Sequence, residues 1–113
     1  MAGSHIAIPT ILKIGSGTLG NVGKYLQSSG FKKAVVFFGN GLVEMFGKTV
    51  MDSLSEADIE VLSYCELDTT DIKDIIDLAF TIDAKTQVIL GIGGGKVIDA
   101  GKYAAYLRKL PFI

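Results

Sequence analysis

The sequence has one cysteine, Cys65, and one histidine, His5. A single cysteine excludes an intrachain disulfide and a cysteine-based metal cluster, and a lone histidine makes no metal site. The 11 basic and 12 acidic residues leave a net charge of -1, so there is no basic excess to attract nucleic acid. The longest apolar runs, at residues 34–38 and 88–90, are far too short to cross a membrane. We therefore expect a cytoplasmic protein in a reducing setting that binds neither nucleic acid nor membrane.

Apolar side chains and glycine are plentiful instead. Hydrophobic residues make up 49% of the 113 residues, and 14 residues are glycine. A chain of this length fits one domain and buries roughly two-thirds of its unfolded surface. The mean hydropathy of +0.42 argues against disorder and predicts a surface rich in apolar groups for a monomer. We therefore expect self-association, and a homo-oligomeric parent protein.

The two ends of the chain differ from its middle. Residues 1–5 are interpreted as a tag, because they have neither the basic start nor the apolar segment of a signal peptide. Residues 110–113 resemble the opening of a further strand. The sequence thus predicts one domain over residues 6–113, and we expect it to be a fragment of a longer protein.

Apolar runs alternate with segments of helical periodicity. The strand-like runs are residues 11–14, 34–38, 60–64 and 87–90, with one more strand starting at Phe112. The helical segments are residues 19–26 closed by Gly30, 43–57, 72–82 capped by Thr70 or Asp71, and 96–109. This order predicts an α/β fold, a parallel sheet with helices on both faces, as in a Rossmann-like nucleotide-binding domain. Ligands in such folds bind at the carboxyl ends of the strands.

Two glycine-containing segments are weak candidates for phosphate binding. Residues 15–20 match the dinucleotide pattern GxGxxG, but no carboxylate stands at residues 38–40, where the ribose-binding acid is expected. Residues 47–49 resemble part of a Walker loop, although Leu42 occupies the place of its first glycine. We favour a structural turn for the first segment and a solvated helix surface for the second.

A third segment, residues 91–99, is the strongest candidate. It follows a buried strand and contains three consecutive glycines, Gly93, Gly94 and Gly95, whose missing Cβ atoms let a diphosphate approach the backbone. Their N–H groups and the start of the next helix form an anion site. Lys96 adds a cation where the helix dipole alone would disfavour one. Asp99 suits that dipole, so it is either a helix stabiliser or a ligand.

The segment from Gly93 to Lys102 resembles a known signature. Its pattern GGG-x-x-x-D-x-x-K is similar to that of the iron-containing alcohol dehydrogenase and glycerol dehydrogenase superfamily. Residues 15–19, 32–36 and 109–113, together with Gly47, also resemble segments of that family. The lysine after the glycines and the ending of residues 110–113 look most like the glycerol-1-phosphate and glycerol dehydrogenase branch.

This resemblance implies the N-terminal NAD(P)-binding domain of a metal-dependent dehydrogenase acting on glycerol, glycerol-1-phosphate or a similar polyol. The implied cofactor-binding residues are Gly93, Gly94, Gly95, Lys96, Asp99 and Asn40. Gly39 and Asn40 stand where the family often has a ribose-binding acid, so the resemblance implies tolerance of NADP(H) as well as NAD(H). The zinc or iron of the family is held by a later helical domain, which implies no catalytic and no metal-binding residues in this chain. Lys102 is interpreted as an ion-pair partner of Asp99. We expect the chain alone to bind cofactor weakly or not at all, and not to turn over.

Two alternatives remain open at this point. One is a domain of a synthase of the dehydroquinate type, which uses NAD transiently and is disfavoured by Lys96 and Lys102. The other is a non-catalytic flavodoxin-like module. A receiver domain is disfavoured because the run at residues 34–38 lacks an aspartate at its end.

Overall fold

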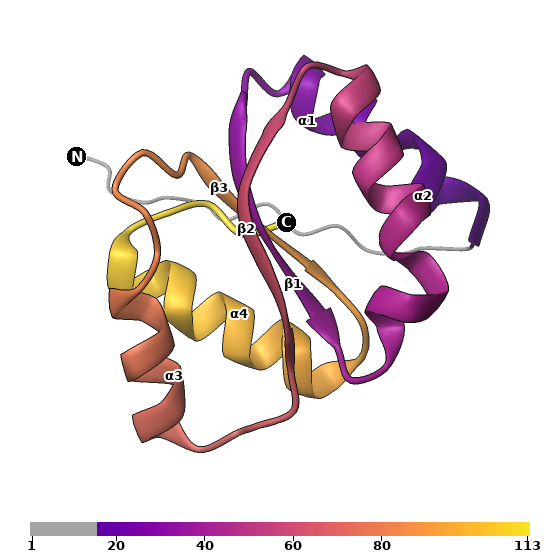
Figure 1. Ribbon diagram of the computed structural model, residues 1–113. Helices are drawn as coiled ribbons and strands as arrows, with labels where there is room; N and C mark the ends of the chain where they lie inside the picture. The colour runs from indigo at the N-terminus through magenta and orange to yellow at the C-terminus, as the bar shows by residue number, and fades with distance from the viewer. Residues whose placement is uncertain (1–15) are drawn as a thin grey trace.

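The computed structural model describes residues 16–113, which form a parallel sheet between two layers of helices (Figure 1). In chain order the elements are a 3-10 helix η1 (Ser16–Asn21), α1 (Val22–Ser28), β1 (Lys33–Gly39), α2 (Leu42–Glu56), β2 (Glu60–Leu67), α3 (Ile72–Phe80), β3 (Val88–Ile92) and α4 (Gly95–Arg108). The predicted strand at residues 11–14 and the predicted tag at residues 1–5 lie outside the described residues. No helix in residues 16–113 is long and apolar enough to cross a membrane.

The three strands run parallel in the order β2-β1-β3, with β1 in the centre. Five successive residues of β1, from Ala34 to Phe38, are buried, because helices cover both faces of this strand. Strand β2 lies at an edge of the described sheet, and most of its residues are exposed or half-buried. The predicted parallel sheet is therefore confirmed.

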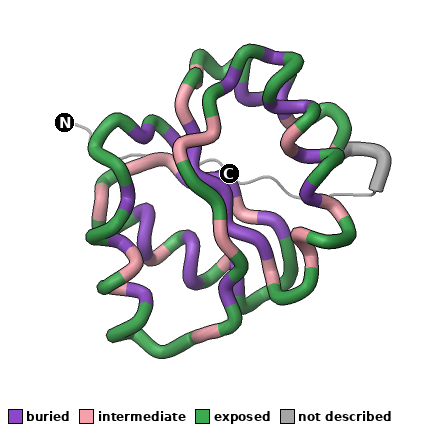
Figure 2. The backbone as a smooth tube through the Cα atoms, viewed as in Figure 1, coloured by how far each residue is buried: buried purple, intermediate pink, exposed green. Residues whose placement is uncertain are grey.

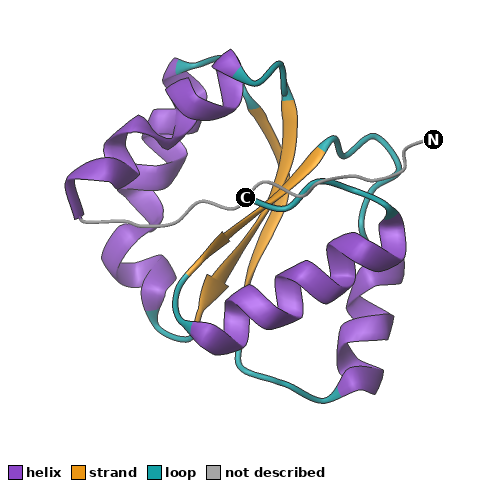
Figure 3. Cartoon of the chain, turned by 180° about the vertical axis from the view of Figure 1, so that it is seen from behind, coloured by secondary structure: helices purple, strands orange, loops and turns teal. Residues whose placement is uncertain are grey.

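Alternate residues of β1 contribute their side chains to two separate hydrophobic cores. Val36 and Phe38 pack with Leu26 of α1 and Leu54 of α2, whereas Val35 and Phe37 pack on the opposite side. The second core is completed from α3 and α4 by buried residues that include Ile75, Ala79, Val97, Ala100 and Ala104. Seen from behind, the strands pass between the two helical layers (Figure 3). The period of two in a strand decides which side chain serves which layer.

The end of the chain adds a short piece to the sheet. Phe112 forms a parallel bridge with Ile89, and the N–H of Gly91 donates to the carbonyl of Ile113 at 2.8 Å. The predicted strand at Phe112 is thus confirmed as a single bridge. The Phe112 ring is 2% exposed and fills the space left by two glycines, since a Cβ on Gly91 or on Gly101 would collide with it.

The Gly101–Phe112 contact is open to a direct test. Replacing Gly101 with Ala places a methyl group into the Phe112 ring, so we expect a loss of about 1–3 kcal/mol in unfolding free energy by urea titration. Gly20→Ala is the matched control, because an added Cβ there meets no atom within 4 Å. The double variant Gly101→Ala/Phe112→Leu recovers part of the loss if the ring is the cause. Equal stability of Gly101→Ala and Gly20→Ala would contradict this packing.

Candidate functional site

The strand order creates a topological switch point at the carboxyl edge of the sheet, between the turns that follow β1 and β3, hereafter called the crevice. The chain passes from β1 to β2 on one side and later returns to place β3 on the other side of β1. The helices that follow β1 and β3 contribute to opposite cores, α2 to one and α4 to the other. Their connecting turns therefore diverge from neighbouring strands, and α/β folds bind ligands at such a switch point. This edge carries the Gly39-Asn40-Gly41 turn and the Gly93-Gly94-Gly95 turn.

Gly93 is a glycine for reasons internal to the fold. Its φ is +148°, a conformation that L side chains rarely adopt. An added Cβ would lie 2.5 Å from the Val97 side chain and 3.2 Å from the backbone N of Gly39. The two turns of the crevice thus approach one another through glycine backbone, and Gly93 is required for that approach.

Gly94 and Gly95 have no such internal requirement. Both are exposed, neither has a positive φ, and a Cβ on either would find no heavy atom within 4 Å. Figure 2 shows the turn between β3 and α4 as exposed backbone beside the buried end of β3. The fold therefore does not require glycine at these two positions, and the lack of side chains there leaves the backbone exposed to solvent. This arrangement fits a ligand that lies against the backbone.

The beginnings of α2, α3 and α4 differ in how their N–H groups are satisfied. At α2, the N–H of Val43 donates to Oε2 of Glu66 at 3.0 Å, and at α3 the N–H of Lys73 donates to Oδ1 of Asp71 at 3.0 Å. The structure thereby settles the cap of α3 in favour of Asp71 over Thr70. At α4, no side chain of the described residues makes a cap hydrogen bond. The start of α4, at the triple glycine, is therefore the one of these three left for an external anion.

Lys96 lies in the first turn of α4 and is 67% exposed. Its Nζ is 4.0 Å from Oδ1 of Asp68, the residue after β2, which is equally exposed. An exposed pair at this distance is weak, so Lys96 remains able to turn toward an anion at the glycine turn. Local sequence patterns do not indicate Asp68 as a partner of Lys96, because the two residues meet only through the sheet.

Asn40 is exposed in the turn after β1, next to the contact between Gly39 and Gly93. The predicted absence of a carboxylate holds for β1 itself, but a carboxylate reaches this turn from β2. Glu66 stands opposite Phe38 in the sheet register and bonds to the start of α2. Sequence reasoning missed Glu66, since the pairing of β1 with β2 is not encoded in local spacing.

Asp99 is exposed and faces a different part of the molecule from Asn40. It lines a groove of about 220 Å³ between α3 and α4, whose other lining residues are Thr70, Ile72, Ile75, Ala100 and Tyr103. The structure shows no ion pair between Asp99 and Lys102, two residues within its described range, so the predicted pair is not formed. Gly93, Gly94, Gly95 and Lys96 are thus contiguous with Asn40 at the crevice, while Asp99 lies one helical turn further along α4.

The other glycine segments have structural surroundings. From Ser16 to Gly20 the chain is 3-10 helical, and the carbonyl of Gly20 accepts a hydrogen bond from Ser53 Oγ at 3.0 Å. Lys48 lies within α2, where its Nζ donates to Asp52 at 2.7 Å, and this bond raises the pKa of Lys48 above its ordinary value. These placements agree with a docked helical turn and a solvated helix surface.

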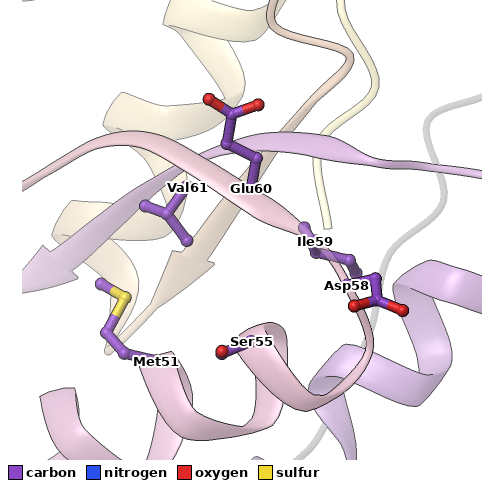
Figure 4. A pocket seen from close by; sticks show the side chains of 6 residues that line it. All are labelled: Met51, Ser55, Asp58, Ile59, Glu60 and Val61. Atoms are coloured by element: carbon purple, nitrogen blue, oxygen red, sulfur yellow. The ribbon is translucent and has the colours of Figure 1, made fainter.

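A larger groove, of about 470 Å³, lies away from the glycine turns. It is lined where α2 ends and β2 begins by Met51, Ser55, Asp58, Ile59, Glu60 and Val61 (Figure 4). The carboxylate of Glu60 is drawn out of this groove and pairs with Lys33 at 2.9 Å. The groove is at the amino end of β2, opposite to the edge at which α/β folds bind ligands.

Within residues 16–113, no group of three or more His, Cys, Asp or Glu side chains is arranged to hold a metal ion. The described residues therefore do not fit the family's metal, and no chemical step is assigned to a metal here.

Comparison with known proteins places this geometry in a family. The family model of iron-containing alcohol dehydrogenases matches residues 13–113, and the chain belongs to that family. Its resemblance to the glycerol-1-phosphate dehydrogenase branch is also confirmed. The chain is 28% identical over 106 residues to the NAD(P)+ glycerol-1-phosphate dehydrogenase of Pyrobaculum islandicum, covering 94% of this chain and 28% of that protein. It is 30% identical over 110 residues to the corresponding protein of Sulfolobus acidocaldarius, covering 96% of this chain and 31% of that one.

Solved structures agree with the family assignment. The glycerol dehydrogenase of Schizosaccharomyces pombe superposes with a TM-score of 0.72 at 26% identity, over 84% of this chain and 24% of that one. The NADH-dependent butanol dehydrogenase A of Thermotoga maritima superposes with a TM-score of 0.63 at 26% identity, over 89% of this chain and 26% of that one. The predicted Rossmann-like α/β fold is confirmed. The chain spans less than a third of the length of these relatives.

Cys65 offers a test of the electrostatics beside the site. The thiol is half-buried on β2, and burial raises its pKa above the usual value because the thiolate is poorly solvated there. We expect iodoacetamide to alkylate Cys65 in the folded chain with a pH midpoint above that of the same chain unfolded in urea. The proton stays on the native thiol to higher pH, so the rate difference is largest on the alkaline side of neutrality. Coincident pH midpoints in the two states would contradict the burial effect.

Proposed function

We propose that residues 6–113 are the cofactor-binding domain of an NAD(P)-dependent, metal-dependent dehydrogenase that acts on glycerol-1-phosphate, glycerol or a related polyol. The observation that carries this proposal is the bare main chain at Gly94 and Gly95, at the start of a helix that no described side chain caps. The family membership and the names of the relatives support the choice of a dinucleotide over other anions.

In this proposal the cofactor's diphosphate lies at the start of α4. The N–H groups of Gly94, Gly95 and Lys96 point at it, and the helix dipole favours its negative charge. The Lys96 ammonium adds a mobile cation that leaves Asp68 to reach the diphosphate. Asn40 lies beside the adenosine half, in the turn after β1. Asp99 faces the groove between α3 and α4, away from Asn40, so we do not assign it a contact with the diphosphate.

The described residues supply only part of what a metal-dependent dehydrogenase requires. In this proposal the glycine turn and the start of α4 form the phosphate-binding site, hereafter the cradle. The described residues contain no group of side chains that could hold a metal ion. A bound nicotinamide ring would supply hydride chemistry, and a metal held by residues outside 16–113 would polarise the substrate oxygen. We propose zinc or iron for that metal and cytoplasm as the location. The chain's own residues bind and orient the dinucleotide.

Gly95→Val is the sharpest test of the cradle. The side chain enters space that is empty in the structure, so the fold is retained while the approach to the backbone is blocked. We expect NADH at millimolar concentration to shift the backbone amide resonances of Gly94, Gly95 and Lys96 in the wild-type chain. In the variant we expect these shifts to be lost, with the unfolding free energy changed by less than about 0.5 kcal/mol.

Gly20→Ala is the control for this experiment, because Gly20 is also open to solvent but lies in η1. Its NADH titration should match the wild type. Equal behaviour of the wild-type chain and Gly95→Val in this titration would overturn the proposed function.

We also propose that the chain self-associates. Phe80 at the end of α3 is 78% exposed and Tyr106 near the end of α4 is 72% exposed. These helix ends are held together by Arg108, whose Nη1 donates to the carbonyls of Ala79 at 2.7 Å and Ile82 at 2.6 Å. Exposed aromatic groups at one end of a molecule favour contact between copies.

Sedimentation velocity tests this proposal. We expect the weight-average sedimentation coefficient to rise with concentration, and the rise to shrink in Phe80→Ser/Tyr106→Ser. The matched control is Met45→Ser, at an exposed residue of α2. A coefficient independent of concentration would rule out self-association over the range measured.

A further inference from the structure

We propose that Glu66 makes the chain prefer NAD(H) over NADP(H), by occupying the helix start that a 2′-phosphate would need. This inference rests on the proposed function and deepens it. It revises the expectation, drawn from the absence of an acid after β1, that NADP(H) would be tolerated as well.

The position of Glu66 relative to the crevice follows from the sheet register. Phe38 pairs with Glu66 and Gly39 pairs with Leu67, so Glu66 is on the strand adjacent to the end of β1, roughly 5 Å away. Its side chain lies on the α2 side of the sheet, because Oε2 accepts the N–H of Val43 at 3.0 Å. The carboxylate therefore stands where the turn after β1 enters α2.

A bound dinucleotide would bring its adenosine ribose to this place. With the diphosphate at the start of α4, after β3, the adenosine half extends along the carboxyl edge toward β1. The ribose hydroxyls of such cofactors lie at the end of the strand adjacent to the glycine turn, which here is β1. The helix N-terminus next to that point is the start of α2.

A 2′-phosphate would seek the N–H groups at the start of α2, as phosphates do at helix N-termini. In this chain the Val43 N–H is already bonded to the Glu66 carboxylate. A phosphate monoester carrying roughly −1.5 to −2 charges would displace that carboxylate or lie beside it. Both outcomes disfavour NADP(H), whereas the uncharged 2′-hydroxyl of NAD(H) meets no such repulsion.

The neighbouring charges reinforce this effect. Asp68 places a second carboxylate just beyond the end of β2, at 4.0 Å from Lys96. This exposed pair is weak, so Lys96 is able to turn toward the diphosphate. The end of β2 thus carries two acids, Glu66 at the start of α2 and Asp68 near Lys96.

The variant Glu66→Gln tests the negative charge of Glu66 without removing the hydrogen bond to the start of α2. The amide oxygen of glutamine still accepts the Val43 N–H, so the start of α2 is kept while the negative charge is removed. The measurement is the ratio of the dissociation constants of NADPH and NADH for the 113-residue chain, by amide-shift titration at low salt. We expect this ratio to fall by about five- to tenfold in Glu66→Gln through tighter NADPH binding, with NADH changed less than about twofold.

Glu60→Gln is the matched control. It removes the same charge from the same strand but at the amino end, six residues and about 20 Å from Glu66. We expect it to leave the ratio unchanged, and we expect 0.5 M salt to shrink the difference between wild type and Glu66→Gln.

Three outcomes would overturn the inference about Glu66. If NADH and NADPH both bind and the ratio is the same in wild type, Glu66→Gln and Glu60→Gln, the inference about Glu66 is overturned while the proposed function stands. An equal change in both variants overturns it as well, because long-range charge then accounts for the effect. If the wild type and Gly95→Val respond equally to both cofactors at the start of α4, the proposed function fails and this inference fails with it.

Discussion

The structure depends on the close contact between the ends of β1 and β3. Gly93 lies against Gly39 and Val97 with a φ of +148°, where any side chain would collide. That contact brings two turns together which then depart to opposite faces of the sheet. The crevice, the exposed backbone of Gly94 and Gly95, and the open start of α4 all follow from it. A side chain at position 93 would collide with Val97 and crowd the backbone of Gly39, so this contact requires glycine.

The starts of α2, α3 and α4 differ in whether a described side chain accepts a hydrogen bond from their N–H groups. Glu66 occupies the start of α2, Asp71 occupies the start of α3, and no described side chain caps α4. Uncapped N–H groups at a helix start require water or a ligand. Under the proposed function, the Glu66 carboxylate that bonds to the start of α2 also lies near the adenosine side of the crevice, and the pairing of β1 with β2 places it there.

The signature that indicates the family occupies two separate places in the fold. The matched region, residues 13–113, contains the whole glycine turn and the start of α4, although the chain spans less than a third of the length of its relatives. The signature from Gly93 to Lys102 divides in the structure into two parts. The glycines and Lys96 lie at the crevice, and Asp99 lies in the groove between α3 and α4. A contiguous motif therefore serves two surfaces of one helix.

The sequence by itself determined the alternation of strands and helices, the buried character of β1, and the glycine turn after β3. These properties are local, because a run of apolar residues, a helical period and a lack of Cβ atoms are readable along the chain. Only the tertiary structure decided that Glu66 reaches the start of α2, that Asp68 lies near Lys96, and that Asp99 and Lys102 do not pair. The first two contacts join residues more than 20 positions apart across strand pairing, and pairing order is not written in local spacing.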